Sequence, residues 1–103
     1  MTHQILYSPR AHQQLRAIYD WIAGEAGPEI AQRFVLSIYD YCDELADFPL
    51  RGRARDDLTN GMRVIGFRRR AMIAFLVTDD EVEIHGVYYG GSDYEALILD
   101  SLD

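Results

Sequence analysis

The stretch MRVIGFRRRAMIAFLVTDDEVEIHGVYYG, residues 62–90, contains three apolar segments separated by short polar turns. Residues 62–67 and 71–77 predict two strands, and TDDE at 78–81 predicts a tight turn into a third strand at 82–90. The order of strands and short turns indicates an antiparallel meander. Residues 71–77 are apolar on both faces, which favours an inner strand covered on both sides.

Alternation along the third of these strands predicts which side chains share a face. Because side chains alternate between the two faces of a strand, we expect Val82, Ile84, Gly86 and Tyr88 on one face. His85 then shares the other face with Tyr89.

Upstream of the meander, residues 4–7 predict a strand that leads directly into a helix. Ser8 is suited to cap that helix, and Pro9 is suited to its first turn. Along the helix the apolar residues recur every three or four positions and predict one buried stripe: Ala11, Leu15, Ile18 and Ile22.

A second helix follows with almost no loop, because Gly27 predicts a helix stop and Pro28 a new first turn. Its predicted apolar stripe extends to the DFPL segment, where Pro49 ends the helical pattern: Ile30, Phe34, Ile38, Cys42 and Leu45. Two helices joined so tightly are expected to form an antiparallel hairpin. Cys42 lies on the stripe, which predicts a buried structural thiol.

The C-terminal segment SDYEALILDSLD predicts a short helix, with Ser92 and Glu95 at capping-box spacing. Its leucines are too apolar for a free tail, so they either fold back onto the sheet or bind a partner. The predicted fold class is α+β: an N-terminal strand, an antiparallel α-helical hairpin packed on a three- to four-stranded antiparallel sheet, and a short C-terminal helix. Residues 1–103 are predicted to form a single domain.

Composition narrows the classes of function. The chain has 103 residues, one cysteine and a net charge of −7 at pH 7. Neither a membrane span nor a signal peptide is recognisable, so we expect a cytoplasmic protein. His3, His12 and His85 are scattered in the sequence, and we expect neither a metal nor another cofactor.

The segment RGRARDDLTNGMRVIGFRRR, residues 51–70, holds seven of the ten positive charges, all of them arginines; we call it the arginine island. An acidic chain is repelled by phosphate backbones at long range, which argues against a stand-alone nuclease or DNA-binding protein. The island is therefore a solvated face, a set of internal pairs with Asp56 and Asp57, or a partner surface. We favour the partner surface, because guanidinium groups suit carboxylates and phosphates.

Three segments together carry a resemblance to a known family: YSPRAHQQLRAIYDWIA, ADFPLRGRARDDLTNGMR and VEIHGVYYGGSDYEAL. In order and spacing they resemble ParE toxins of the RelE/ParE superfamily, the toxic halves of type II toxin-antitoxin operons. The resemblance covers about residues 4–97 and implies a protein that inhibits DNA gyrase and has no catalytic residues. It also implies a ParD-like antitoxin partner, whose C-terminal segment wraps the toxin in a hetero-oligomer.

RelE-type relatives share the fold but cleave mRNA on the ribosome, an activity that needs cations and a proton-transfer group. Many family members carry arginines and a histidine at the end of the last strand and in the following turn. In this chain Gly86, Gly91, Ser92 and Tyr89 replace that pattern. The alternative interpretations are a ribosome-dependent nuclease that uses Arg63, Arg70 and Tyr89, and an antitoxin-binding relic without toxicity.

The residues expected to bind the antitoxin or the target come from the island, the last strand and the C-terminal segment. They are Arg51, Arg53, Arg55, Arg63, Arg68, Arg69, Arg70, Tyr89, Leu97 and Leu99. We expect no membrane contact and no direct sequence-specific binding of nucleic acid.

Overall fold

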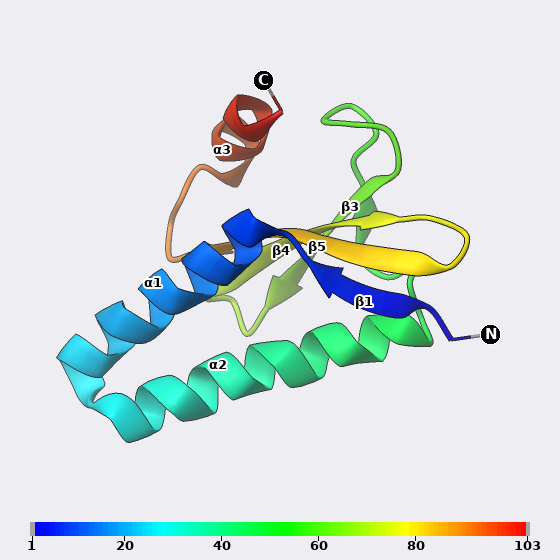
Figure 1. Ribbon diagram of the computed structural model, residues 1–103. Helices are drawn as coiled ribbons and strands as arrows, with labels where there is room; N and C mark the ends of the chain where they lie inside the picture. Colours follow the sequence, from blue (N-terminus) through cyan, green and yellow to red (C-terminus); the bar gives the residue numbers. More distant parts are fainter. Residues whose placement is uncertain (1, 103) are drawn as a thin grey trace.

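The computed structural model describes residues 2–102 as a five-stranded sheet with a helical hairpin on one face and a short helix on the other (Figure 1). The strand order is β1-β5-β4-β3-β2, and only β1 is parallel to its neighbour. The strands are β1 (Gln4–Tyr7), β2 (Arg53–Ala54), β3 (Met62–Phe67), β4 (Ala71–Val77) and β5 (Glu81–Tyr89). The predicted α+β class is confirmed, and β2 adds a two-residue edge strand to the predicted sheet.

Helix α1 (Pro9–Ala26) begins as predicted. The Ser8 side-chain oxygen accepts a hydrogen bond from the Ala11 N–H at 3.0 Å, which satisfies a free donor of the first turn. All four residues of the predicted stripe are buried against the sheet and the second helix.

A single residue, Gly27, connects α1 to α2 (Pro28–Asp43). Its N–H donates to the Ala23 carbonyl at 3.0 Å, and its own carbonyl accepts from the Ala31 N–H at 3.2 Å. The backbone angles of Gly27, φ 96° and ψ 159°, lie in a region that is almost restricted to glycine. The tight hairpin therefore depends on this residue.

The buried stripe of α2 differs from the prediction at its first position. Ile30 is 49% exposed, whereas Ala31 is fully buried in its place. Residue 31 lies seven positions before the buried Ile38, and seven residues of an α-helix return to within about 20° of the same direction. After α2 the chain forms one 3₁₀ turn, η1 (Glu44–Ala46), which buries Leu45. Cys42 is buried as predicted, and burial raises the pKa of its thiol to about 12.

The inner strand β4 is covered on both faces, which confirms that prediction. Ile73 and Phe75 pack against the hairpin, while Ala74 faces a second, smaller core. That second core is closed by Leu58 of the loop before β3 and by Ile98 of helix α3 (Tyr94–Ser101).

A β-bulge in β5 corrects the predicted distribution of its side chains. Ala74 pairs with Gly86 but Phe75 pairs with Ile84, so His85 is an extra residue in the strand. Beyond the bulge the alternation is reversed: Val87 and Tyr89 join the hairpin face, whereas Tyr88 enters the second core. The prediction that His85 and Tyr89 share a face was therefore wrong.

The cap of α3 also differs from the prediction. The Asp93 side chain, and not Ser92, accepts the capping hydrogen bond, from the Ala96 N–H at 3.3 Å. Ser92 instead donates to the Tyr89 carbonyl at 2.8 Å. The short helix folds back onto the sheet through Ile98, although it leaves Leu97 and Leu99 exposed. Within residues 2–102, no helix is long and apolar enough to cross a membrane.

Candidate functional site

The structure divides the arginine island into two parts. The first part contains Arg51, Arg53, Arg55 and Arg63, and Arg55 lies at its centre. Its guanidinium donates two hydrogen bonds of 2.9 Å to the Asp57 carboxylate, one of 3.2 Å to the Tyr94 hydroxyl, and one to the Glu95 carboxylate. The side chain is only 14% exposed. Hydrogen bonds to Asp57 and then Glu95 raise the pKa of Arg55, and the bond from Arg55 lowers the pKa of Asp57. Arg55 thus ties α3 to the loop before β3.

Arg63 is bound by backbone carbonyls. Its guanidinium donates to the carbonyls of Arg51 at 2.9 Å, Leu50 at 3.0 Å and Gly52 at 3.3 Å. These bonds hold the incoming loop against β3. At Gly52, with φ 76°, a Cβ atom would lie 2.3 Å from the Val64 carbonyl oxygen, so only glycine permits this close approach.

Arg51 and Arg53 also have internal partners. Arg51 lies 3.5 Å from the Glu44 carboxylate, and its guanidinium is 5.5 Å from the centre of the Tyr41 ring. Arg53 donates to the Tyr94 hydroxyl at 3.3 Å. Internal pairing, one of the three interpretations of the island, therefore accounts for much of its first part. Asp56 takes no part in it, and its carboxylate accepts from the Gly61 N–H at 2.9 Å.

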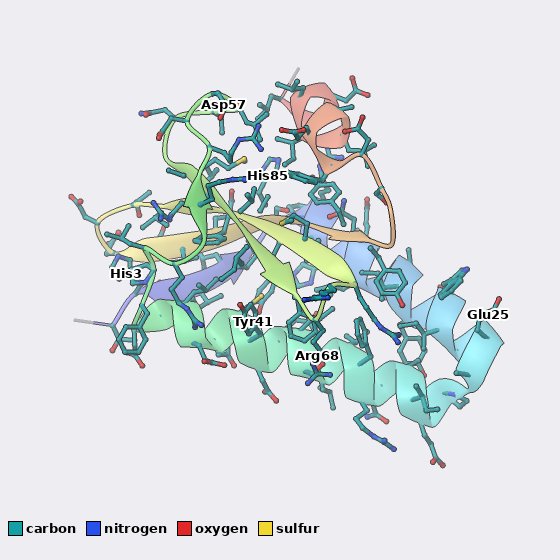
Figure 2. All side chains as sticks on the ribbon, turned by 180° about the vertical axis from the view of Figure 1, so that it is seen from behind. His3, Glu25, Tyr41, Asp57, Arg68 and His85 are labelled. Atoms are coloured by element: carbon teal, nitrogen blue, oxygen red, sulfur yellow. The ribbon has the colours of Figure 1, made fainter. Side chains whose placement is uncertain are left out.

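The second part of the island is the turn between β3 and β4, residues 67–70, which we call the arginine turn. It is closed by a hydrogen bond of 2.9 Å from the Arg70 N–H to the Phe67 carbonyl. Arg68, Arg69 and Arg70 are all exposed, and within residues 2–102 their guanidiniums form no hydrogen bond or ion pair. Figure 2 shows Arg68 beside α2 and Asp57 on the opposite side of the sheet.

Tyr89 lies next to the arginine turn and belongs to a row of aromatic rings. It pairs with Ala71, and the neighbouring Gly90 N–H donates to the Arg70 carbonyl at 2.8 Å. The Tyr89 ring is 5.8 Å from that of Trp21 and 5.6 Å from that of Phe34, centre to centre. Phe34 in turn lies 5.8 Å from Phe67 of the turn.

Of the residues named for the nuclease alternative, the structure brings two together. Arg70 and Tyr89 are neighbours at one end of the sheet. Arg63 lies four residues before Phe67 on β3, which at the usual strand rise separates it from that end by about 13 Å. Its guanidinium is also engaged by three carbonyls.

Gly86 and His85 have local structural explanations. A Cβ atom on Gly86 would lie 2.5 Å from the hydroxyl of Tyr88, whose side chain is only 4% exposed. The glycine therefore makes room for a core residue. His85 lies 2.9 Å from the Ser101 hydroxyl of α3, and burial, followed by the charge of Arg10, lowers its pKa.

Leu97 and Leu99 remain on the surface of α3, at 44% and 50% exposure. Leu97 lines a shallow groove of about 240 Å³ between α1 and the end of β5, together with Trp21 and Tyr89. Among the described residues, no group of three histidine, cysteine or acidic side chains gathers that could hold a metal ion.

The sequence did not point to the partners that the arginines have in space. Tyr94 and Glu95 were not expected beside Arg55, because nothing in the sequence pairs positions so far apart. Trp21 was also not among the expected binding residues, although it is 58% exposed and its ring contacts that of Tyr89.

Comparison with solved structures identifies the class of fold. The chain is similar to one in the structure described as "Chromosomal ParDE TA system from P. aeruginosa", with a TM-score of 0.75 and 24% sequence identity. The match covers 86% of this chain and 97% of the other, so the two chains share a fold. No curated protein sequence matches.

The family follows from the sequence comparison. Residues 5–94 match the family described as "ParE toxin of type II toxin-antitoxin system, parDE". Because this match covers most of the chain, the protein belongs to the ParE toxin family, as the resemblance indicated.

Proposed function

We propose that this protein is a toxin that inhibits DNA gyrase and that a ParD-like antitoxin neutralises it. The placement of Arg63 is the main support. The nuclease alternative needs both of its named arginines, Arg63 and Arg70, beside Tyr89 to stabilise the phosphate where the proton is transferred. Arg63 instead donates to three backbone carbonyls and lies far along β3 from Tyr89. The protein then acts by binding its target, without a cofactor and without chemistry of its own.

The expected antitoxin surface combines charge and apolar side chains. Arg68, Arg69 and Arg70 are exposed cations. Leu97 is an exposed apolar residue in the groove that Tyr89 also lines, and Leu99 is exposed on the opposite face of α3. A segment with acidic and apolar residues would match both features. Its binding would produce a hetero-oligomer in the cytoplasm and would cover surface that the target also uses.

Expression in bacterial cells separates the candidate activities. Gyrase inhibition predicts induction of a DNA-damage reporter and filamentation while protein synthesis continues. Ribosome-dependent mRNA cleavage predicts rapid arrest of labelled amino-acid incorporation, and a relic without toxicity predicts neither response. Arrest of translation before any reporter signal would contradict the proposal, as would normal growth at a confirmed level of folded protein.

A further inference from the structure

Within residues 2–102, the arginine turn is the part of the island whose guanidiniums form no hydrogen bond and no ion pair. Arg51, Arg55 and Arg63 have acidic or carbonyl partners, and Arg53 bonds to Tyr94. Arg68, Arg69 and Arg70 have neither. Three consecutive charges on one turn repel one another, so an anionic partner would lower the energy of this arrangement.

The backbone of the turn is unfavourable for arginine. Arg68 and Arg69 have φ values of 50° and 55°, and they are the only residues other than glycine with positive φ among residues 2–102. An L-residue in this conformation costs about 1–2 kcal/mol. A hairpin turn with two positive φ values favours Asn-Gly. Arginines at both positions are therefore not explained by folding.

A row of packed aromatic rings, which begins with the buried Phe67, links the turn to the surface at Trp21. The Arg68 guanidinium lies 4.9 Å from the centre of the Phe67 ring, and Phe67 contacts Phe34. The row continues through Tyr89 to Trp21, which is 58% exposed. Exposed cations together with an exposed aromatic ring are the combination by which proteins bind single-stranded nucleic acid.

We propose that the arginine turn and Trp21 form a contact for a nucleic acid strand. Arg68 and Arg69 bind phosphates, and the Trp21 indole stacks on an unpaired base. The exposed indole favours nucleic acid over a purely acidic ligand, because carboxylates alone would give no role to the Trp21 ring. We assign the strand to DNA held by gyrase, and this assignment rests on the proposed function.

The net charge of the protein makes this contact local and weak on its own. A chain with a net charge of −7 repels nucleic acid at long range. The repulsion is screened beyond a Debye length of about 8 Å at physiological salt. A toxin already bound to its target would present the turn to DNA at a high effective concentration.

Binding of labelled oligonucleotides to the purified protein, without gyrase, tests the proposal. The probes are a short fluorescent single strand, the corresponding duplex and a poly-glutamate peptide of equal charge. The variants are Arg68→Asn/Arg69→Gly, which installs the preferred turn residues, and Trp21→Ala. The matched control, Arg10→Ala/Arg16→Ala, removes the same charge from exposed positions on α1. Urea unfolding confirms that each variant is folded.

We expect the single strand to bind most tightly at low salt. The turn variant should unfold no more readily than the wild type, and its slope of log affinity against log salt should fall by about 1.4, or 0.7 for each phosphate contact. Trp21→Ala should weaken binding about tenfold. The control should keep the wild-type slope within about 0.5, since it removes no phosphate contact.

Several results would overturn the proposal. The first two are an unchanged salt slope in the turn variant and wild-type affinity of Trp21→Ala for the single strand. The other two are tighter binding of poly-glutamate than of the single strand, and the absence of oligonucleotide binding at about 50 mM salt. Because gyrase is absent, failure here is distinct from failure of the proposed gyrase inhibition.

Discussion

The Arg55 guanidinium bonds to the Glu95 carboxylate and so joins the loop before β3 to a helix 40 residues later in the chain. The same guanidinium forms two bonds to Asp57. One arginine therefore fixes α3 over the second core, where Ile98 is fully buried. This leaves the arginine turn, on the other side of the sheet, as the part of the island available to partners.

The Arg55 cluster makes stability depend on pH. The bond from Arg55 lowers the pKa of Asp57. A lowered folded-state pKa stabilises the fold above the ordinary aspartate pKa of about 3.9, and the contribution is lost as pH falls through the folded value. We expect Asp57→Asn to be less stable than the wild type at pH 7, with the difference shrinking below about pH 4. Urea unfolding of both proteins between pH 7 and pH values below about 4 measures this difference in stability. A difference that stays constant with pH would contradict the prediction.

Replacing Arg63 should destabilise the protein. Arg63→Ala leaves the carbonyls of residues 50–52 without their donor, and we expect the free energy of unfolding to fall by about 1–3 kcal/mol. Arg69→Ala is the control, because this exposed side chain has no such bonds and its loss should change stability by less than about 0.5 kcal/mol. Equal effects of the two substitutions in urea unfolding would show that Arg63 has no structural role.

The α1–α2 connection provides a matched pair of glycines. Gly27→Ala places a side chain at φ 96° and should reduce the free energy of unfolding by about 1–3 kcal/mol. Gly24 lies inside α1 with open space around the position of a new Cβ, so Gly24→Ala should raise the free energy of unfolding by about 0.5–1 kcal/mol. Thermal or urea unfolding compares them, and opposite signs are the expected outcome. A stable Gly27→Ala variant would mean that the connection tolerates another geometry.

The glycines of the sheet allow a similar comparison. Gly86→Ala forces the buried Tyr88 ring to move, which should destabilise the protein by about 1–3 kcal/mol. Gly66→Ala, on β3, meets nothing within 4 Å and should be neutral or slightly stabilising. If both variants were equally stable, steric exclusion by Tyr88 would not explain the absence of a side chain at position 86.

The elements of the fold were predictable because their signals are local. The bounds of β1, β3 and β4 match the predicted strands, and Ser8 caps α1 as its position indicated. Hydrophobic periodicity and capping chemistry act within a few residues, so one sequence is enough to detect them. The wrong prediction that Ile30 is buried was also a local one. The predicted stripe began one residue too early, since Ala31 and not Ile30 is buried.

The site was less predictable because it depends on distant pairs. The bulge that puts His85 and Tyr89 on opposite faces arises from the pairing of β4 with β5, and the alternation of β5 alone cannot reveal it. The partners of Arg55 come from α3, so the sequence could show the seven arginines but not which of them are engaged. The sequence shows how many charged side chains a segment has, whereas tertiary contacts determine which of these side chains remain unpaired.

Supercoiling of relaxed plasmid by purified gyrase, in the presence of this protein freed from any antitoxin, tests the central proposal most directly. Linear DNA is scored in the same gel, and the folded state of the protein is checked beforehand. We expect supercoiling to be inhibited as the protein is added, with cleaved linear DNA accumulating. Unchanged supercoiling and no linear DNA, at an excess of folded protein, would contradict gyrase inhibition.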